Sequence, residues 1–86
     1  MADLLFLYQV LEKLKAGEYA IDQKGGIGLY YNMNNTLVLF NMEHGLLFTD
    51  ITITLPFKAR YEIKVADSIF RKMIRGFRLV HTKYLF

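Results

Sequence analysis

The chain has 86 residues and no cysteine, which predicts one domain over residues 1–86 and excludes a disulfide framework, a thiolate zinc site and a thiol nucleophile. Apolar residues make up 53% of it, against roughly 45–50% in an average domain, so an intrinsically disordered chain is excluded as well. The net charge of +3 is uneven: residues 1–43 hold three lysines against five acidic residues, and residues 44–86 hold eight Lys and Arg against three. The C-terminal half is therefore expected to present a basic surface.

No run of about 18 apolar residues, long enough to span a bilayer, occurs in the sequence. The apolar stretch 4–10 follows an aspartate where a secretory signal has basic residues, and no small-residue cleavage site comes after it. We therefore expect a cytoplasmic protein with no membrane partner.

The first element is predicted to be a helix over residues 3–16, because its apolar residues recur at spacings of three and four. Asp3 is expected to cap its N-terminus, and Gly17 is expected to end it. The residues expected on its buried face are Leu4, Leu7, Tyr8, Leu11 and Leu14.

After Gly17 the apolar residues alternate with polar ones, which is the period of a β-strand. Turns are expected at residues 24–26, 34–35 and 43–45, where Gly and Asn tolerate the backbone of a tight hairpin. The predicted strands cover residues 18–22, 27–33, 36–42, 46–55 and 57–65.

A second, shorter helix is predicted between a cap at Asp67 and a stop at Gly76. Its outward side is expected to be basic, and residues 77–86 are expected to form a last strand or a docked tail. The residues expected to point inward are Ile69, Phe70, Met73 and Ile74.

Together these elements predict an α+β fold: an N-terminal helix, an antiparallel sheet of four to five strands in a meander, and a short basic C-terminal helix with a tail. We expect both helices to pack on one face of the sheet.

Catalytic and metal-binding groups are scarce. His44 and His81 are the only histidines and lie far apart in the sequence. A zinc site needs three or four ligands, so these two residues do not indicate one. Ser68 is the only serine and suits a helix N-terminus better than nucleophilic attack, and Asp50 fits an outward strand position. The glycines of residues 25–28 match no phosphate-binding motif. We therefore expect no enzyme, no metal and no cofactor.

Large aromatic residues lie on the predicted strands, and the alternation places Tyr30, Phe40 and Phe48 on one face. Two short helices can cover one face of such a sheet but not two. We therefore expect these rings, together with Phe6, to be buried by a protein partner or in a homodimer.

Basic residues of the C-terminal half form the second candidate surface. Lys and Arg beside aromatic rings can bind nucleic acid, so a nucleic-acid-binding protein is the alternative hypothesis. The leading hypothesis is a small non-enzymatic interaction protein that inhibits or modulates a host macromolecule, in the manner of phage or mobile-element accessory proteins. The basic residues proposed to bind are Lys58, Arg60, Lys64, Arg71, Lys72, Arg75 and Arg78.

Overall fold

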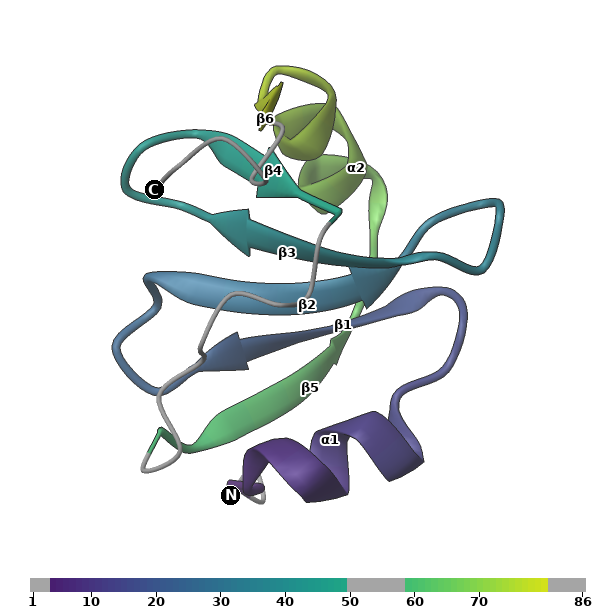
Figure 1. Ribbon diagram of the computed structural model, residues 1–86, viewed down its shortest axis with the longest axis vertical. Coiled ribbons are helices and arrows are strands. Elements are labelled where there is room, and N and C mark those ends of the chain that lie inside the picture. Colours follow the sequence, from purple (N-terminus) through teal and green to yellow (C-terminus); the bar gives the residue numbers. More distant parts are fainter. Residues whose placement is uncertain (1–3, 50–58, 81–86) are drawn as a thin grey trace.

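In the part of the chain that the structure describes, a six-stranded β-sheet lies between two helices (Figure 1). The computed structural model describes residues 4–49 and 59–80. The predicted α+β fold, with an N-terminal helix, a mostly antiparallel sheet and a short basic C-terminal helix, is confirmed. The elements in chain order are α1 (Leu7–Lys13), β1 (Glu18–Asp22), β2 (Ile27–Tyr31), β3 (Leu37–Asn41), β4 (Leu46–Phe48), β5 (Tyr61–Val65), α2 (Ser68–Arg75) and β6 (Arg78–Val80).

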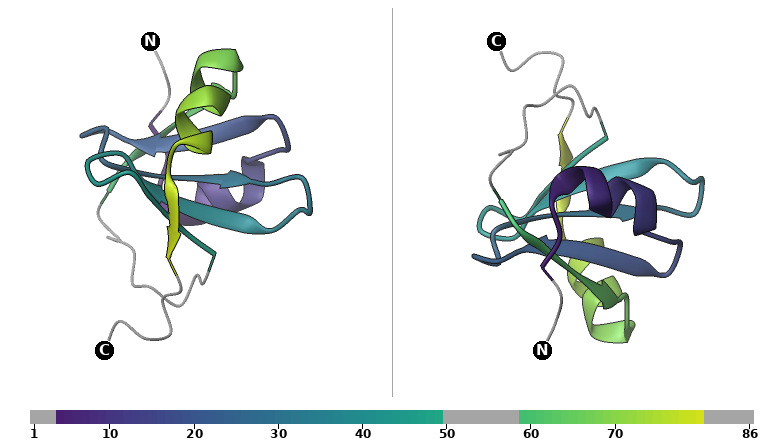
Figure 2. Two further views of the ribbon diagram at one scale, coloured as in Figure 1. Left: turned by 90° about the horizontal axis from the view of Figure 1, so that it is seen from above. Right: turned by 90° about the horizontal axis from the view of Figure 1, so that it is seen from below.

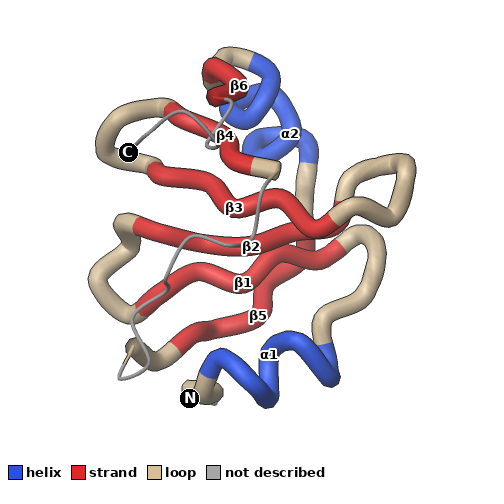
Figure 3. Tube along the Cα trace, in the orientation of Figure 1, coloured by secondary structure: helices blue, strands red, loops and turns tan. Residues whose placement is uncertain are grey.

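The sheet is a meander only from β1 to β4, whose successive strands pair antiparallel. β5 pairs antiparallel with β1, placing Glu18 opposite Val65, and β6 pairs parallel with β4. The strand order is therefore β5-β1-β2-β3-β4-β6 (Figure 3). The described part of the chain thus has six strands where four to five were predicted. The meander ends at β4 because β5 joins the opposite edge.

The three turns of the meander each contain a residue with a left-handed backbone, which Gly and Asn tolerate best. The φ angle is 73° at Gly25, 58° at Asn35 and 63° at Gly45. Side chains that precede the turns accept backbone N–H groups, as Asn41 Oδ1 does from Glu43 at 3.0 Å. The turns predicted at residues 24–26, 34–35 and 43–45 are confirmed.

Helix α1 begins at Leu7, later than the predicted residue 3, and ends at Lys13, before the predicted residue 16. Leu14 is its C-cap, so the prediction that Gly17 ends the helix is wrong, and Gly17 lies in the turn that follows. Leu5 instead forms an antiparallel bridge with Tyr61: its N–H donates to the Tyr61 carbonyl at 2.7 Å, and its carbonyl accepts from the Tyr61 N–H at 2.8 Å. The Gln9 side chain accepts the N–H of Phe6 at 2.9 Å and so supports the first turn. The predicted cap Asp3 lies outside the described residues.

The later start also changes which side of α1 is buried. Val10 and Leu14 pack against the sheet, whereas Leu4, Tyr8 and Leu11 are exposed, so the predicted buried stripe is wrong for these three. The core between α1 and the sheet contains Val10, Leu14, Ala20, Leu29, Leu39 and Tyr61.

Helix α2 begins as predicted, because Asp67 Oδ1 accepts the N–H of Phe70 at 2.9 Å. Phe70 is buried and Ile74 is half-buried. Ile69 is 75% exposed, so its predicted inward orientation is wrong.

Phe70 packs into an aromatic cluster on the face of the sheet opposite α1. Its ring stacks on Tyr19 with centroids 3.9 Å apart, and its centroid lies 5.8 Å from that of Tyr30 and 5.5 Å from that of Phe40. These three strand residues alternate with core residues that face α1. The two helices therefore cover opposite faces (Figure 2), and the prediction that both pack on one face is wrong.

Gly28 makes room for the ring of Phe40. The two residues face each other across the β2–β3 ladder, and Phe40 is fully buried. A Cβ at Gly28 would overlap both the Phe40 ring and the carbonyl oxygen of Ala20. A glycine is therefore required at this point of the sheet.

The aromatic residues predicted to share an uncovered face do not do so. Phe40 is buried with Phe70 beside it, and Tyr30 is half-buried. Phe48 lies opposite Leu39 and packs against the α1 core, so its predicted face is wrong. The homodimer stays a prediction, but an uncovered aromatic face no longer supports it.

Candidate binding groove

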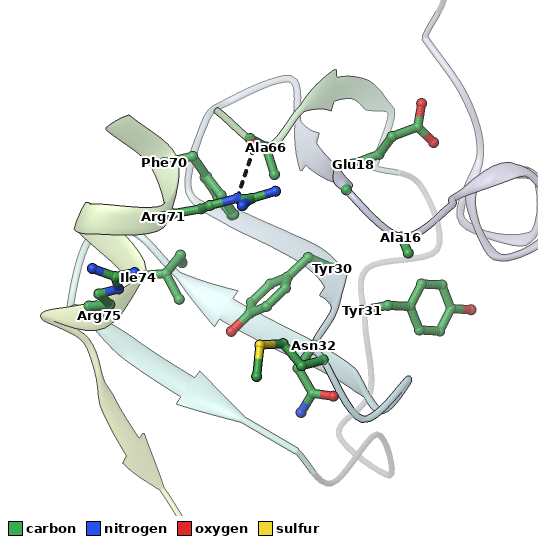
Figure 4. A pocket seen from close by; sticks show the side chains of 12 residues that line it. Ala16, Glu18, Tyr30, Tyr31, Asn32, Ala66, Phe70, Arg71, Ile74 and Arg75 are labelled. Atoms are coloured by element: carbon green, nitrogen blue, oxygen red, sulfur yellow. Dashed lines mark hydrogen bonds between the residues drawn. The ribbon is translucent and has the colours of Figure 1, made fainter. Parts of the chain in front are cut away.

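A groove of about 420 Å³ lies between α2, the segment that leads into β1, and the end of β2 with the loop that follows it (Figure 4). This volume is within the range of roughly 300–1,000 Å³ that ligand pockets occupy. The groove is lined by Ala16, Gly17, Glu18, Tyr30, Tyr31, Asn32, Met33, Ala66, Phe70, Arg71, Ile74 and Arg75.

One wall is the segment that enters β1, and it is fixed to the start of α2. Gly17 has a φ of 85°, and its carbonyl accepts the N–H of Ala66 at 2.9 Å. Glu18 Oε1 accepts the N–H of Lys15 at 3.0 Å, which ties this carboxylate to its own turn. This wall is therefore preformed.

The floor is apolar and aromatic. Tyr30 lies at the centre of the groove, with Phe70 and Ile74 of α2 beside it (Figure 4). Burial raises the pKa of the Tyr30 hydroxyl, so the ring carries a neutral hydroxyl at physiological pH. No residue within 4–49 and 59–80 forms a hydrogen bond with this hydroxyl.

The loop between β2 and β3 closes the far end of the groove. Asn32 Oδ1 accepts the N–H of Asn34 at 2.9 Å and that of Thr36 at 3.0 Å, so the loop backbone is ordered by its own first residue. Met33 lies in this loop and is 100% exposed. A fully exposed methionine beside an apolar floor adds adaptable contact surface.

Positive charge comes from α2. Arg71 and Arg75 line the groove one helical turn apart, and Arg71 Nε donates to the Ala66 carbonyl at 3.2 Å. Lys72 on the same helix and Arg78 at the start of β6 are also exposed. The single ion pair between described side chains joins Lys64 to Glu62 at 3.8 Å, so these four cations have no carboxylate partner in the described part of the chain.

No protein-family model, curated protein or solved structure matches this chain. The chemistry of the groove is therefore the basis on which a function can be proposed.

The structure brings together three of the predicted binding residues, since Tyr30, Arg71 and Arg75 all line the groove. Lys72 belongs to the same helix and Arg78 to the strand that follows, and neither lines the groove. The predicted basic strip is thus divided, because its remaining members belong to the segment before β5 or to β5 itself.

Two of these remaining members, Arg60 and Lys64, lie away from the groove lining. Lys64 pairs with Glu62 on β5, and Arg60 lies over the ring of Phe6, with its guanidinium carbon 3.7 Å from the ring centroid. Phe6 also stacks on Tyr8 near α1. Lys58 lies outside the described residues.

The residues weighed for catalysis form no site in the part of the chain that the structure describes. His44 is exposed in the β3–β4 turn, and Ser68 is exposed at the first position of α2. Asp50 and His81 lie outside the described residues. Within residues 4–49 and 59–80, no three His, Asp or Glu side chains converge as a metal site would require, and neither helix has the length and apolar character to cross a membrane.

Sequence reasoning missed the loop residues and Ile74 as parts of the groove. The segment from Asn32 to Asn35 places a methionine in an asparagine-rich turn, where an apolar side chain has no local use. This was the one available signal. The sequence gives no comparable signal for Ile74, because an apolar residue on the inward side of a helix normally belongs to the core.

Proposed function

We propose that this protein is a small non-enzymatic interaction protein that holds an anionic macromolecular partner on the surface formed by α2 and the groove beside it. The observation that carries the proposal is the set of exposed cations on α2 and at the start of β6, none of which forms an ion pair with a described carboxylate. Like charges one turn apart, as at Arg71 and Arg75, weaken an isolated helix by about 0.2–0.5 kcal/mol. A partner that supplies negative charge would offset this cost.

Binding is expected to inhibit or modulate the partner, because the described residues form a positively charged groove and no set of catalytic side chains. The lack of cysteine fits a reducing compartment, so we place this action in the cytoplasm.

Site-specific photo-crosslinking tests the proposal. A photoreactive residue at Lys72 on α2 is expected to give one stoichiometric adduct in cells of the source organism. The same residue at Lys13, an exposed lysine on α1, is the matched control and should give none. The Lys72 adduct is expected to disappear with the double charge reversal Arg71→Glu and Arg75→Glu. Equal adducts from both positions, or none from Lys72, would contradict the proposal.

Nucleic-acid binding is the second candidate, and the same exposed cations on α2 and β6 favour it. Each phosphate contact adds about −0.9 to the slope of log affinity against log salt concentration on duplex DNA. A gel-shift series in rising salt measures this slope. Absence of binding at about 50 mM salt would remove the candidate.

A further inference from the structure

The groove and the arginines on its wall differ from the rest of the basic surface, because they combine charge with an apolar floor. Arg71 and Arg75 line the groove together with Ile74, which lies between them in sequence and points toward Tyr30 (Figure 4). A purely ionic ligand would satisfy the arginines and leave this floor exposed to water. The lining thus fits a ligand that has both carboxylates and an apolar part.

The rings of Phe40, Phe70 and Tyr30 near the groove pack on one another and are poorly placed to stack nucleobases. Tyr31, which also lines the groove, is half-buried against the core that faces α1. Phe40 is fully buried, and Phe70 lies parallel to Tyr19 with centroids 3.9 Å apart and an interplanar angle of 4°. Tyr30 is packed against both Phe70 and Phe40, with centroids 5.8 Å and 6.1 Å away. Single-stranded nucleic-acid sites need ring faces that are open to successive bases. The packing therefore favours a peptide over an oligonucleotide.

Polar groups at the groove also suit a peptide. The Tyr30 hydroxyl has no described partner, and Asn32 uses its Oδ1 within its own loop, which leaves its amide nitrogen as a donor. Guanidinium groups bind carboxylates through two parallel hydrogen bonds. Glu18, the one carboxylate in the lining, opposes two arginines, so the lining has a net positive charge.

We propose that the groove binds a short acidic segment of a partner protein, with one large apolar side chain of that segment placed between Tyr30 and Ile74 and its flanking carboxylates paired with Arg71 and Arg75. This inference rests on the proposed function and names the chemistry of the partner. The exposed Met33 packs against the inserted side chain at the loop end of the groove.

Fluorescence anisotropy with defined peptides tests the inference on the full chain. The probes are short labelled peptides of alternating Glu and Asp with one central Leu, Phe or Trp, and the matched probe has Ala at that position. Saturable binding is expected for at least one bulky probe, with an affinity on the order of tenfold or more above that of the Ala probe. Equal affinity of all probes, or no saturable binding, would overturn the inference.

Two variants of α2 separate groove binding from general attraction between charges. Arg75→Ala and Lys72→Ala each remove one exposed positive charge from the same helix, but only Arg75 lines the groove. Arg75→Ala is expected to weaken the bulky probe on the order of tenfold, and Lys72→Ala by less than about twofold. Equal losses would overturn the inference.

Competition with a thymidine oligonucleotide separates this inference from the alternative function. The oligonucleotide is expected to leave the bulky probe bound at physiological salt. Displacement at comparable concentration would overturn the peptide inference and support nucleic-acid binding. A specific Lys72 crosslink to a protein without any acidic and apolar segment would also overturn it, while leaving the proposed function intact.

Discussion

Replacing Gly28 by alanine tests how the aromatic side of the core is packed. The new Cβ would lie 2.6 Å from Phe40 Cε1 and closer still to Phe40 Cζ and the Ala20 carbonyl oxygen. Neither can withdraw easily, because Ala20 belongs to the β1–β2 ladder and Phe40 is enclosed by three other rings. Overpacking of this kind costs about 1–3 kcal/mol. Alanine regains about 0.5–1 kcal/mol of backbone entropy relative to glycine in a strand.

We expect Gly28→Ala to lower the free energy of unfolding by about 2 kcal/mol. This value takes the overpacking cost near the upper end of its range and subtracts the entropy gain. For a domain of this size that loss lowers Tm by about 8–16 °C. Urea unfolding and calorimetry measure both quantities. Gly26→Ala is the matched control, because a Cβ at Gly26 would meet no atom within 4 Å, and its stability should change by less than about 0.5 kcal/mol. Equal stability of Gly28→Ala and the parent chain would refute the packing of Phe40 over this glycine.

Three further substitutions follow from the same structure. Asp67→Ala removes the acceptor for the Phe70 N–H and should lower the free energy of unfolding in urea by about 1 kcal/mol. An unchanged free energy would show that this cap does not stabilise α2. Phe70→Ala should cost about 3–5 kcal/mol, because its buried ring joins α2 to the aromatic cluster; a loss below about 1 kcal/mol would show that α2 is held otherwise. The Tyr61 hydroxyl is buried without a partner among the described residues, so Tyr61→Phe should gain on the order of 1 kcal/mol. Burial and the charge of Asp22 raise the pKa of Tyr61 in the folded chain, so ionisation of this hydroxyl favours the unfolded chain. The free energy of unfolding should therefore fall as pH rises above about 10, and it should fall less steeply in Tyr61→Phe.

Local signals in the sequence were sufficient for the turns and for the two ends of α2. Asp67, Gly25 and Gly45 act through their own backbone or that of a near neighbour, so their roles can be predicted without knowing the fold. The same holds for the basic outer side of α2, because it follows from helical spacing alone.

Pairings between distant segments could not be predicted in this way. The start of α1 is set by the bridge of Leu5 to Tyr61, and this pairing shifts burial from Tyr8 to Val10. The face of Phe48 depends on the register of the β3–β4 turn, where a shift of one residue moves every side chain to the other side of the sheet. The groove arises where three separate segments meet, so only Tyr30, Arg71 and Arg75 were identified from their residue types.

The position of β5 has a consequence for how the chain acquires its structure. Glu18 pairs with Val65, so β1 obtains its second neighbour only after most of the chain has been synthesised. Pairings between residues so distant in sequence slow folding, because a long loop must close before they form. Until β5 docks, one edge of β1 is open and α1 lacks Tyr61 as a packing partner. A nascent chain therefore exposes an unpaired strand edge beside apolar side chains, which is the stage at which aggregation would compete with folding.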